Sequence, residues 1–132
     1  MEVRSIYKYA RMSDQKVREV TRAVTGMPVS QALNILAFTP KKAAKLVGKT
    51  LQAAIANAEN NHELDSEDLI IKSATASKGG MLKRIMPRAR GSAGGIKKRM
   101  SHITVVLAQR EADKAAEEKP KKAKKEAAAK SE

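Results

Sequence analysis

The sequence predicts an α+β fold in which a short N-terminal strand is followed by helices and then by a long β-hairpin. Three observations lead to this prediction. Apolar residues recur at helical spacing between residues 13 and 60, and two β-rich segments follow at 69–86 and 96–107. The segment between these two holds a proline and several glycines, which are typical of a turn. A chain of 132 residues is long enough for one small domain.

The N-terminal part is predicted to form an edge strand followed by a short helix. Residues 2–11 alternate loosely between apolar and polar side chains, which favours a strand. Ser13 is a candidate N-cap, and Gly26 is a candidate for the residue that ends the helix. The apolar stripe between them consists of Val17, Val20 and Val24.

Two further helices are predicted before the hairpin. The second begins at Ser30, and its apolar stripe consists of Leu33, Leu36 and Ala37. Thr39 and Pro40 predict the start of the third, with threonine as the cap and proline in the first turn. This helix is expected to run to about Asn60 and to be ~30 Å long. Its inner stripe consists of Ala43, Val47, Leu51, Ala54, Ile55 and Ala58.

Two polar segments are not expected to join the core. Residues 63–68 form the one acidic patch of the body and are predicted to be a solvent-facing loop, away from any anionic partner. Residues 111–132 contain seven lysines, six acidic residues and many alanines, without an apolar stripe. We therefore predict one α+β domain at 1–110 and a disordered tail at 111–132.

The segment 78–102, called the arm below, is cationic throughout. Neighbouring residues of a strand point to opposite faces, so adjacent basic residues make both faces of a ribbon positive. Such a ribbon has no apolar face to bury, and a two-stranded ribbon alone in water is marginally stable. We expect the arm to project by roughly 30 Å and to become ordered when a polyanion encloses it. The arm contains no carboxylate. Its charged residues are Lys78, Lys83, Arg84, Arg88, Arg90, Lys97, Lys98 and Arg99.

The composition indicates an anionic partner. The net charge is +13 and the isoelectric point is about 10.2, which favours nucleic acid first and an acidic membrane surface second. Aromatic residues make up only 2% of the chain, so the stacking platforms of single-strand binders are not expected. The remaining mode is many phosphate contacts together with recognition of shape by arginine.

Catalysis and metal binding are not expected. The chain has no cysteine, and its only histidines are His62, at a helix end, and His102, in a strand. We interpret His62 as a surface residue and His102 as a polar or RNA contact, with a catalytic or metal-binding role as the alternative for His102. The glycine pairs at 79–80 and 94–95 lack the strand–loop–helix context of a nucleotide fingerprint. No cofactor is expected, and no apolar run approaches a membrane span, so the protein is expected in the cytosol.

Several motifs resemble one protein family. Residues 81–91 read Met-Leu-Lys-Arg-Ile-Met-Pro-Arg-Ala-Arg-Gly, and residues 96–106 read Ile-Lys-Lys-Arg-Met-Ser-His-Ile-Thr-Val-Val. Upstream, segments 9–18, 29–33, 40–44 and 54–60 match in the same order. Together they resemble the bacterial large-subunit ribosomal protein twenty-two family, from about residue 3 to residue 110.

The resemblance implies a fold, a set of partners and a set of contact residues. It implies three antiparallel strands packed with three helices, bound to large-subunit ribosomal RNA beside neighbouring ribosomal proteins, without a homo-oligomer or a membrane. The hairpin is expected to line the nascent-peptide exit tunnel, where the growing polypeptide passes. The implied RNA contacts are Arg11, Lys16, Arg18, Lys83, Arg84, Arg88, Arg90, Lys97, Lys98, Arg99, Ser101 and His102. The implied tunnel-lining tip consists of Arg88, Ala89, Arg90, Gly91, Ser92 and Ala93.

Two other interpretations of the residues remain open at this point. One is a DNA-architectural protein whose basic arm wedges Pro87 into a minor groove. The other is an arm that binds an acidic protein. Monomeric behaviour with a preference for folded ribosomal RNA over duplex DNA would exclude the first, and loss of binding after nuclease treatment would exclude the second.

Overall fold

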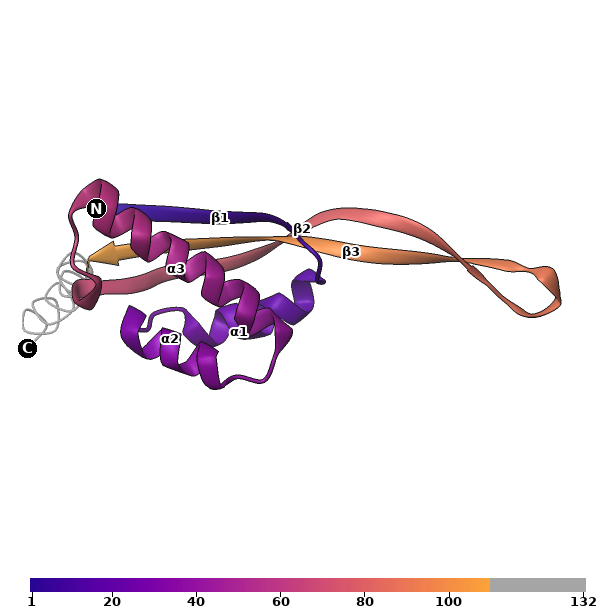
Figure 1. Cartoon of the computed structure of the whole chain (residues 1–132), viewed down its shortest axis with the longest axis horizontal. Helices are drawn as coiled ribbons and strands as arrows, with labels where there is room; N and C mark the ends of the chain where they lie inside the picture. The colour runs from indigo at the N-terminus through magenta and orange to yellow at the C-terminus, as the bar shows by residue number, and fades with distance from the viewer. Residues whose placement is uncertain (110–132) are drawn as a thin grey trace, which may run out of the picture.

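The computed structural model describes residues 1–109 as a helical body from which two long strands extend (Figure 1). In chain order the elements are β1 (Glu2–Ala10), α1 (Asp14–Val24), α2 (Val29–Phe38), α3 (Lys42–His62), the short 3-10 helix η1 (Ser66–Asp68), β2 (Leu69–Pro87), the short 3-10 helix η2 (Ala89–Gly91) and β3 (Ala93–Gln109). The predicted α+β class, with three helices and a long hairpin, is confirmed. The predicted tail lies outside the described residues.

The three strands form one antiparallel sheet in the order β1-β3-β2. The helix α3 packs on β1 and β3, and α1 packs along β2. Alternation along β1 separates the two faces of the sheet, because Val3 and Ser5 are buried whereas Arg4, Ile6 and Lys8 are exposed. One face therefore carries the core, and the other face is open to solvent.

The core is aliphatic and lies between the sheet and the helices. Alanines on α3, including Ala54 and Ala58, are fully buried, which lets this helix approach the sheet closely. The parts of β2 and β3 that lie beside the helices join the core through side chains such as Leu69, Ile71 and Ile103. The largest fully buried side chains are Leu51, Leu69, Ile71, Ile103, Leu107, Val17, Val24, Val29, Val47 and Val105.

The predicted start of the third helix was wrong by two residues. Thr39 ends α2 instead, because its backbone N–H and its hydroxyl both donate to the carbonyl of Ile35, at 3.0 and 2.6 Å. Pro40 lies in the link, and α3 begins at Lys42. In α2, Leu36 is buried as expected, but Ala37 is exposed and Ala32 takes the inward position.

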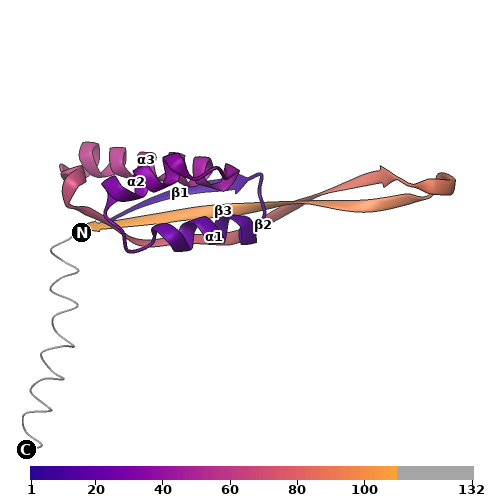
Figure 2. The ribbon, with the colours of Figure 1, turned by 90° about the horizontal axis from the view of Figure 1, so that it is seen from below.

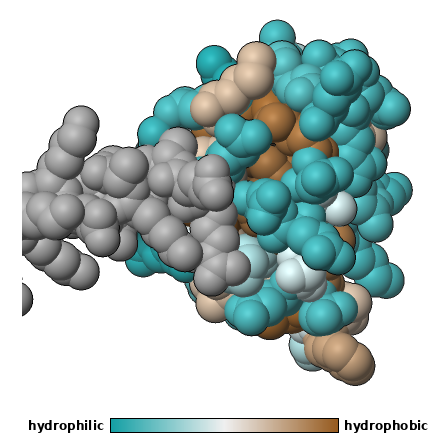
Figure 3. Space-filling model, turned by 90° about the vertical axis from the view of Figure 1, so that its left-hand side faces the viewer, coloured by the Kyte–Doolittle hydropathy of each residue, from teal (hydrophilic) through white to brown (hydrophobic). Residues whose placement is uncertain are grey.

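The acidic segment 63–68 lies at the end of the body opposite the arm (Figure 1). Its carboxylate-bearing residues are exposed, so the prediction of a solvent-facing segment is confirmed, although residues 66–68 form a 3-10 turn rather than an open loop. Figure 3 views the molecule from this end and shows a largely hydrophilic surface with some apolar side chains exposed between polar ones. The acidic segment and the cationic arm thus lie at opposite ends of the long axis of the molecule.

Candidate nucleic-acid interface

The arm consists of β2 and β3 after they leave the body, and Figure 2 shows it extending well beyond the helices. From residue 78 to residue 100 no side chain is buried. A bulge interrupts the pairing between Lys78 and Met81, where the chain leaves the body. Gly79 lies in this bulge, and a Cβ added there would lie 3.0 Å from the backbone of Met100. The close approach of the two strands therefore depends on glycine at this position.

The strand register makes both faces of the arm positive, as the sequence predicted. Lys83 lies opposite Lys97, and on the other face Leu82 lies opposite Lys98. Like charges directly opposite each other destabilise a β-ladder. The arm also carries exposed apolar side chains, which the prediction did not consider. Among them, Ile85 is 77% exposed. Nη1 of Arg84 donates to the carbonyl of Lys83 at 2.9 Å, but none of the ion pairs found within residues 1–109 involves an arm cation.

The tip of the arm is a compact turn held by its own backbone. The N–H of Arg88 donates to the carbonyl of Ser92 at 2.8 Å, and the hydroxyl of Ser92 donates to the carbonyl of Ala89 at 2.9 Å. Arg90 and Gly91 have positive φ angles of 58° and 69°. The arginine thus occupies a backbone region that non-glycine residues rarely adopt.

Glycine also positions a side chain at the tip. A Cβ added to Gly94 would lie 2.7 Å from Nε of Arg88, so this arginine crosses the space that a larger residue would fill. Every residue from 87 to 93 is exposed. The tip therefore presents guanidinium groups beside small side chains.

Where the arm meets the body, cations from α1, α3, β3 and the loop after β1 surround a hollow of about 270 Å³, also lined by Met12 and Ser13. We call these cations the root cluster: Arg11, Lys16, Lys42, Lys97 and Arg99. No carboxylate lines this hollow, and none of the ion pairs found within residues 1–109 involves the root cluster or the arm. A concave positive surface without a carboxylate in its lining is suited to phosphate groups.

The root cluster contains four of the predicted RNA contacts and adds Lys42, which is not among them. Its neighbour Lys41 is different, because its ammonium group pairs with Oε2 of Glu19 at 2.9 Å. The hydrogen bond from Lys41, followed by its charge, lowers the pKa of the Glu19 carboxyl. Lys41 is thus partly neutralised within the body, whereas Lys42 adds its charge to the hollow.

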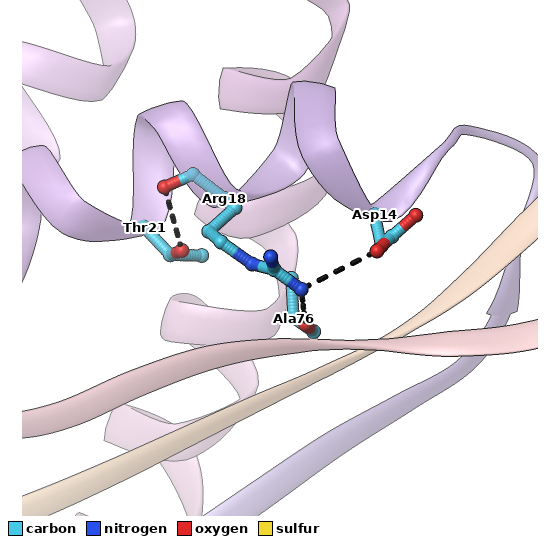
Figure 4. A network of polar contacts seen from close by, with 4 residues as sticks. All are labelled: Asp14, Arg18, Thr21 and Ala76. Carbon is cyan, nitrogen blue, oxygen red and sulfur yellow. Dashed lines mark hydrogen bonds and ion pairs between the residues drawn. The ribbon is translucent and has the colours of Figure 1, made fainter.

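Arg18 differs from the other predicted contacts because it joins two elements of the body (Figure 4). Its Nη2 lies 3.3 Å from Oδ2 of the buried Asp14 and 3.4 Å from the carbonyl of Ala76 on β2. About 45% of its side chain stays exposed. The structure gives Arg18 a role in fastening α1 to β2, and a contact with RNA stays a prediction.

Two further predicted contacts are not fully exposed: Ser101 is buried, and His102 is hydrogen-bonded to another part of the chain. Ser101 is completely buried, and its hydroxyl has no hydrogen-bond partner among the described residues, so it does not belong to the exposed surface. His102 is half-buried, and its Nδ1 accepts a hydrogen bond of 3.0 Å from the backbone N–H of Tyr9.

Within residues 1–109, no group of three or more potential metal ligands comes together. In the same part of the chain, no helix combines the length and the apolar character required to span a membrane. The class of protein defined by this fold and surface is a small basic α+β protein with an exposed cationic arm and a root cluster of cations at its foot.

Comparison with known proteins specifies the family. Residues 5–108 match the model of the family described as ribosomal protein L22p/L17e. Over 111 residues the chain is 55% identical to the large ribosomal subunit protein uL22 of Akkermansia muciniphila, covering 84% of this chain and 99% of the relative. The uL22 of Methylacidiphilum infernorum is also 55% identical, with coverages of 84% and 97%. That of Thermosipho africanus is 49% identical over 117 residues, with coverages of 89% and 79%.

The chain therefore belongs to the ribosomal protein L22p/L17e family. It is a structural, non-enzymatic protein of the large subunit of the cytoplasmic ribosome. The predicted family, the predicted absence of enzymatic function and the predicted location are thereby confirmed.

Proposed function

We propose that residues 1–110 form a single RNA-binding domain, which binds large-subunit ribosomal RNA through the root cluster and the arm. The observation that carries this proposal is the continuous cationic surface at the foot of the arm and along it, which lacks any carboxylate. The relatives are named as proteins of the large ribosomal subunit, which consists of RNA and protein, and this supports RNA as the polyanion.

The geometry favours recognition through phosphates and shape. The root cluster surrounds a hollow from several sides, and the arm carries charge on both faces, so RNA segments are able to lie around it rather than along one side. Arginine in the arm is able to bind phosphate with two hydrogen bonds at once. Ser101 is not among the proposed contacts because it is buried. On binding, the RNA neutralises repulsion such as that between Lys83 and Lys97.

The experiment is a salt titration of binding between the purified chain and transcribed large-subunit RNA. If about ten phosphates are neutralised, the slope of log K against log salt is about −7 to −9. Duplex DNA of equal length is the control competitor and is expected to compete weakly. A slope near −1, or equal competition by duplex DNA, would contradict the proposal.

We further propose that the tip, residues 88–93, lines the nascent-peptide exit tunnel of the large subunit, beside neighbouring ribosomal proteins. Its small, exposed side chains and two arginines suit a passage that must stay open. The chain has no cysteine, so Ser92→Cys provides a unique thiol at the tip. Ribosomes with this variant are expected to form disulfides with a cysteine placed in a stalled nascent chain, whereas Ser30→Cys on the body is expected to form none. If the Ser92→Cys and Ser30→Cys variants formed disulfides with the nascent chain to the same extent, the proposal that the tip lines the tunnel would be contradicted.

A further inference from the structure

The open face of the sheet carries a second hollow at the foot of the arm, on the face opposite the core. Its volume is about 320 Å³, which is at the lower end of the range for small-ligand sites, about 300–1,000 Å³. All three strands contribute to its lining, which contains two cations and no carboxylate. The lining residues are Arg4, Ile6, Lys8, Tyr9, Ser77, His102 and Thr104.

An irregularity in β1 brings Tyr9 into this hollow. Regular alternation would send Lys8 and Tyr9 to opposite faces, but both line the hollow. The register shifts between Tyr7 and Ala10, and Tyr9 has a φ of 56°, in the left-handed region that bulky residues rarely adopt. Backbone strain of this kind is concentrated at functional sites. The strained residue here is also an aromatic one.

Two contacts join Tyr9 to His102. The backbone N–H of Tyr9 donates to Nδ1 of His102 at 3.0 Å, which requires that Nδ1 carry no proton. The neutral ring therefore has its proton on Nε2, where it serves as a donor. The two rings meet edge to face with centroids 4.7 Å apart, and Tyr9 remains 60% exposed. Much of the tyrosine ring is consequently open to a ligand.

The tyrosine and phenylalanine side chains of the protein are all exposed. Tyr7, Tyr9 and Phe38 are 43%, 60% and 87% exposed, and these are all the aromatic residues in the sequence apart from the histidines. Exposed aromatic rings provide stacking surface for bases. The low aromatic content had argued against such a platform, but it did not reveal that one tyrosine lies beside two cations and a histidine.

We propose that this hollow binds one unstacked nucleotide of the large-subunit RNA. Its base stacks on Tyr9, the cations Arg4 and Lys8 hold the flanking phosphates, and Nε2–H of His102 donates to an oxygen of the base or ribose. The proposal rests on the proposed binding of ribosomal RNA and extends it to the face of the sheet opposite the core. It assigns roles to Arg4, Lys8 and Tyr9, which lie outside the arm and the root cluster.

The first test compares Tyr9→Leu with Tyr9→Phe in binding to transcribed large-subunit RNA. Loss of one stacked base is expected to weaken binding by Tyr9→Leu roughly 5- to 150-fold without changing the salt slope, because no phosphate contact is removed. Tyr9→Phe keeps the ring and is expected to bind within about twofold of the original protein. Unchanged binding by Tyr9→Leu would overturn the proposed nucleotide site in the hollow but would leave the proposed function intact.

A second variant keeps the test decisive if Tyr9→Leu perturbs the fold through the lost ring contact. Lys8→Gln is expected to reduce the magnitude of the salt slope by about 0.7–0.9, which corresponds to one phosphate. An unchanged slope would count against the site. If the original protein itself fails to bind the RNA, both this proposal and the proposed function are overturned.

Photocrosslinking of assembled large subunits identifies the occupant directly. Ultraviolet irradiation is expected to attach a nucleotide to Tyr9, identified by mass spectrometry of the peptide that contains it, and the adduct is expected to disappear in Tyr9→Leu. A crosslink from the hollow to another protein, or a Tyr9 peptide without any adduct, would overturn the proposal.

Discussion

The body and the arm belong to the same sheet but differ in what holds them. In the body, side chains such as Leu51 and Ile103 are completely buried between strands and helices. In the arm, no side chain between residues 78 and 100 is buried, and cations such as Lys83 and Lys97 lie opposite each other. The body is stabilised by its own core, whereas the arm is held mainly by ladder hydrogen bonds, so we expect it to depend on an external partner.

The largest expected difference comes from apolar truncation in the two regions. Leu51→Ala leaves a cavity in the core and is expected to reduce the free energy of unfolding by about 2–5 kcal/mol. Ile85→Ala, at a position that is 77% exposed in the arm, is expected to change it by less than about 0.5 kcal/mol. Urea unfolding measures both variants. Equal losses would show that the arm contributes to the folded core.

Charge reversal is expected to give the opposite pattern. Lys97→Glu places an acid opposite Lys83 and removes a root-cluster cation, so it is expected to leave stability unchanged or raised by about 0.2–1 kcal/mol. Binding to large-subunit RNA is expected to fall about tenfold or more, and the salt slope to lose about one unit.

Lys49→Glu makes the same charge change on α3, outside the root cluster and the arm, and serves as the matched control. Its effect on RNA binding is expected to be much smaller. If the two variants lose affinity equally, net charge rather than the position of the charge determines binding.

A smaller effect on stability is expected at Arg18, which links α1 to β2 and is also a predicted RNA contact. Asp14 lies at the start of α1, and its buried carboxylate pairs with Arg18. Asp14→Ala removes this carboxylate and is expected to lower the free energy of unfolding by about 1 kcal/mol. The freed arginine remains cationic, so RNA affinity measured below the melting temperature is expected to change little. A loss of affinity as large as that of Lys97→Glu would indicate that Arg18 must be held in place to bind RNA.

The smallest expected effect is a dependence of stability on pH. The hydrogen bond and charge of Lys41 lower the folded-state pKa of Glu19 below its ordinary value of 4.5. The pair therefore stabilises the fold above pH 4.5, and this contribution is lost as the pH falls through the lowered pKa. Melting temperatures between pH 7 and 3 are expected to fall slightly less for Glu19→Gln than for the original protein. An identical fall would show that the pair contributes nothing, as is common at exposed sites.

Much of the fold was predictable because periodicity reports directly on burial. The apolar stripe of α1 placed its core residues correctly, and the alternation of residues 103–107 matches their alternating burial. The same alternation includes Ser101, which lies on the buried face two residues before Ile103, so the sequence held a signal that family resemblance obscured. The role of Thr39 was ambiguous, because a threonine hydroxyl is able to bond backward to end a helix or forward to begin one.

The candidate site was predictable in its charges but not in its geometry. The sequence identified most root-cluster cations, yet Lys42 joins them only because α3 begins beside the foot of the arm. The hollow around Tyr9 depends on a bulge and on its pairing with His102, 93 residues away in the chain. Local patterns do not encode such long-range proximity, and a lone tyrosine in an edge strand gives no signal of it.

Hydrogen exchange of the purified chain, with and without large-subunit RNA, tests most directly whether the arm depends on its partner. Free in solution, the amides of α3 and of residues 103–107 are expected to exchange slowly, while those of residues 78–100 exchange rapidly. Addition of RNA is expected to protect the arm and to leave the body unchanged. Arm amides that are already as protected as those of α3 without RNA would contradict the account.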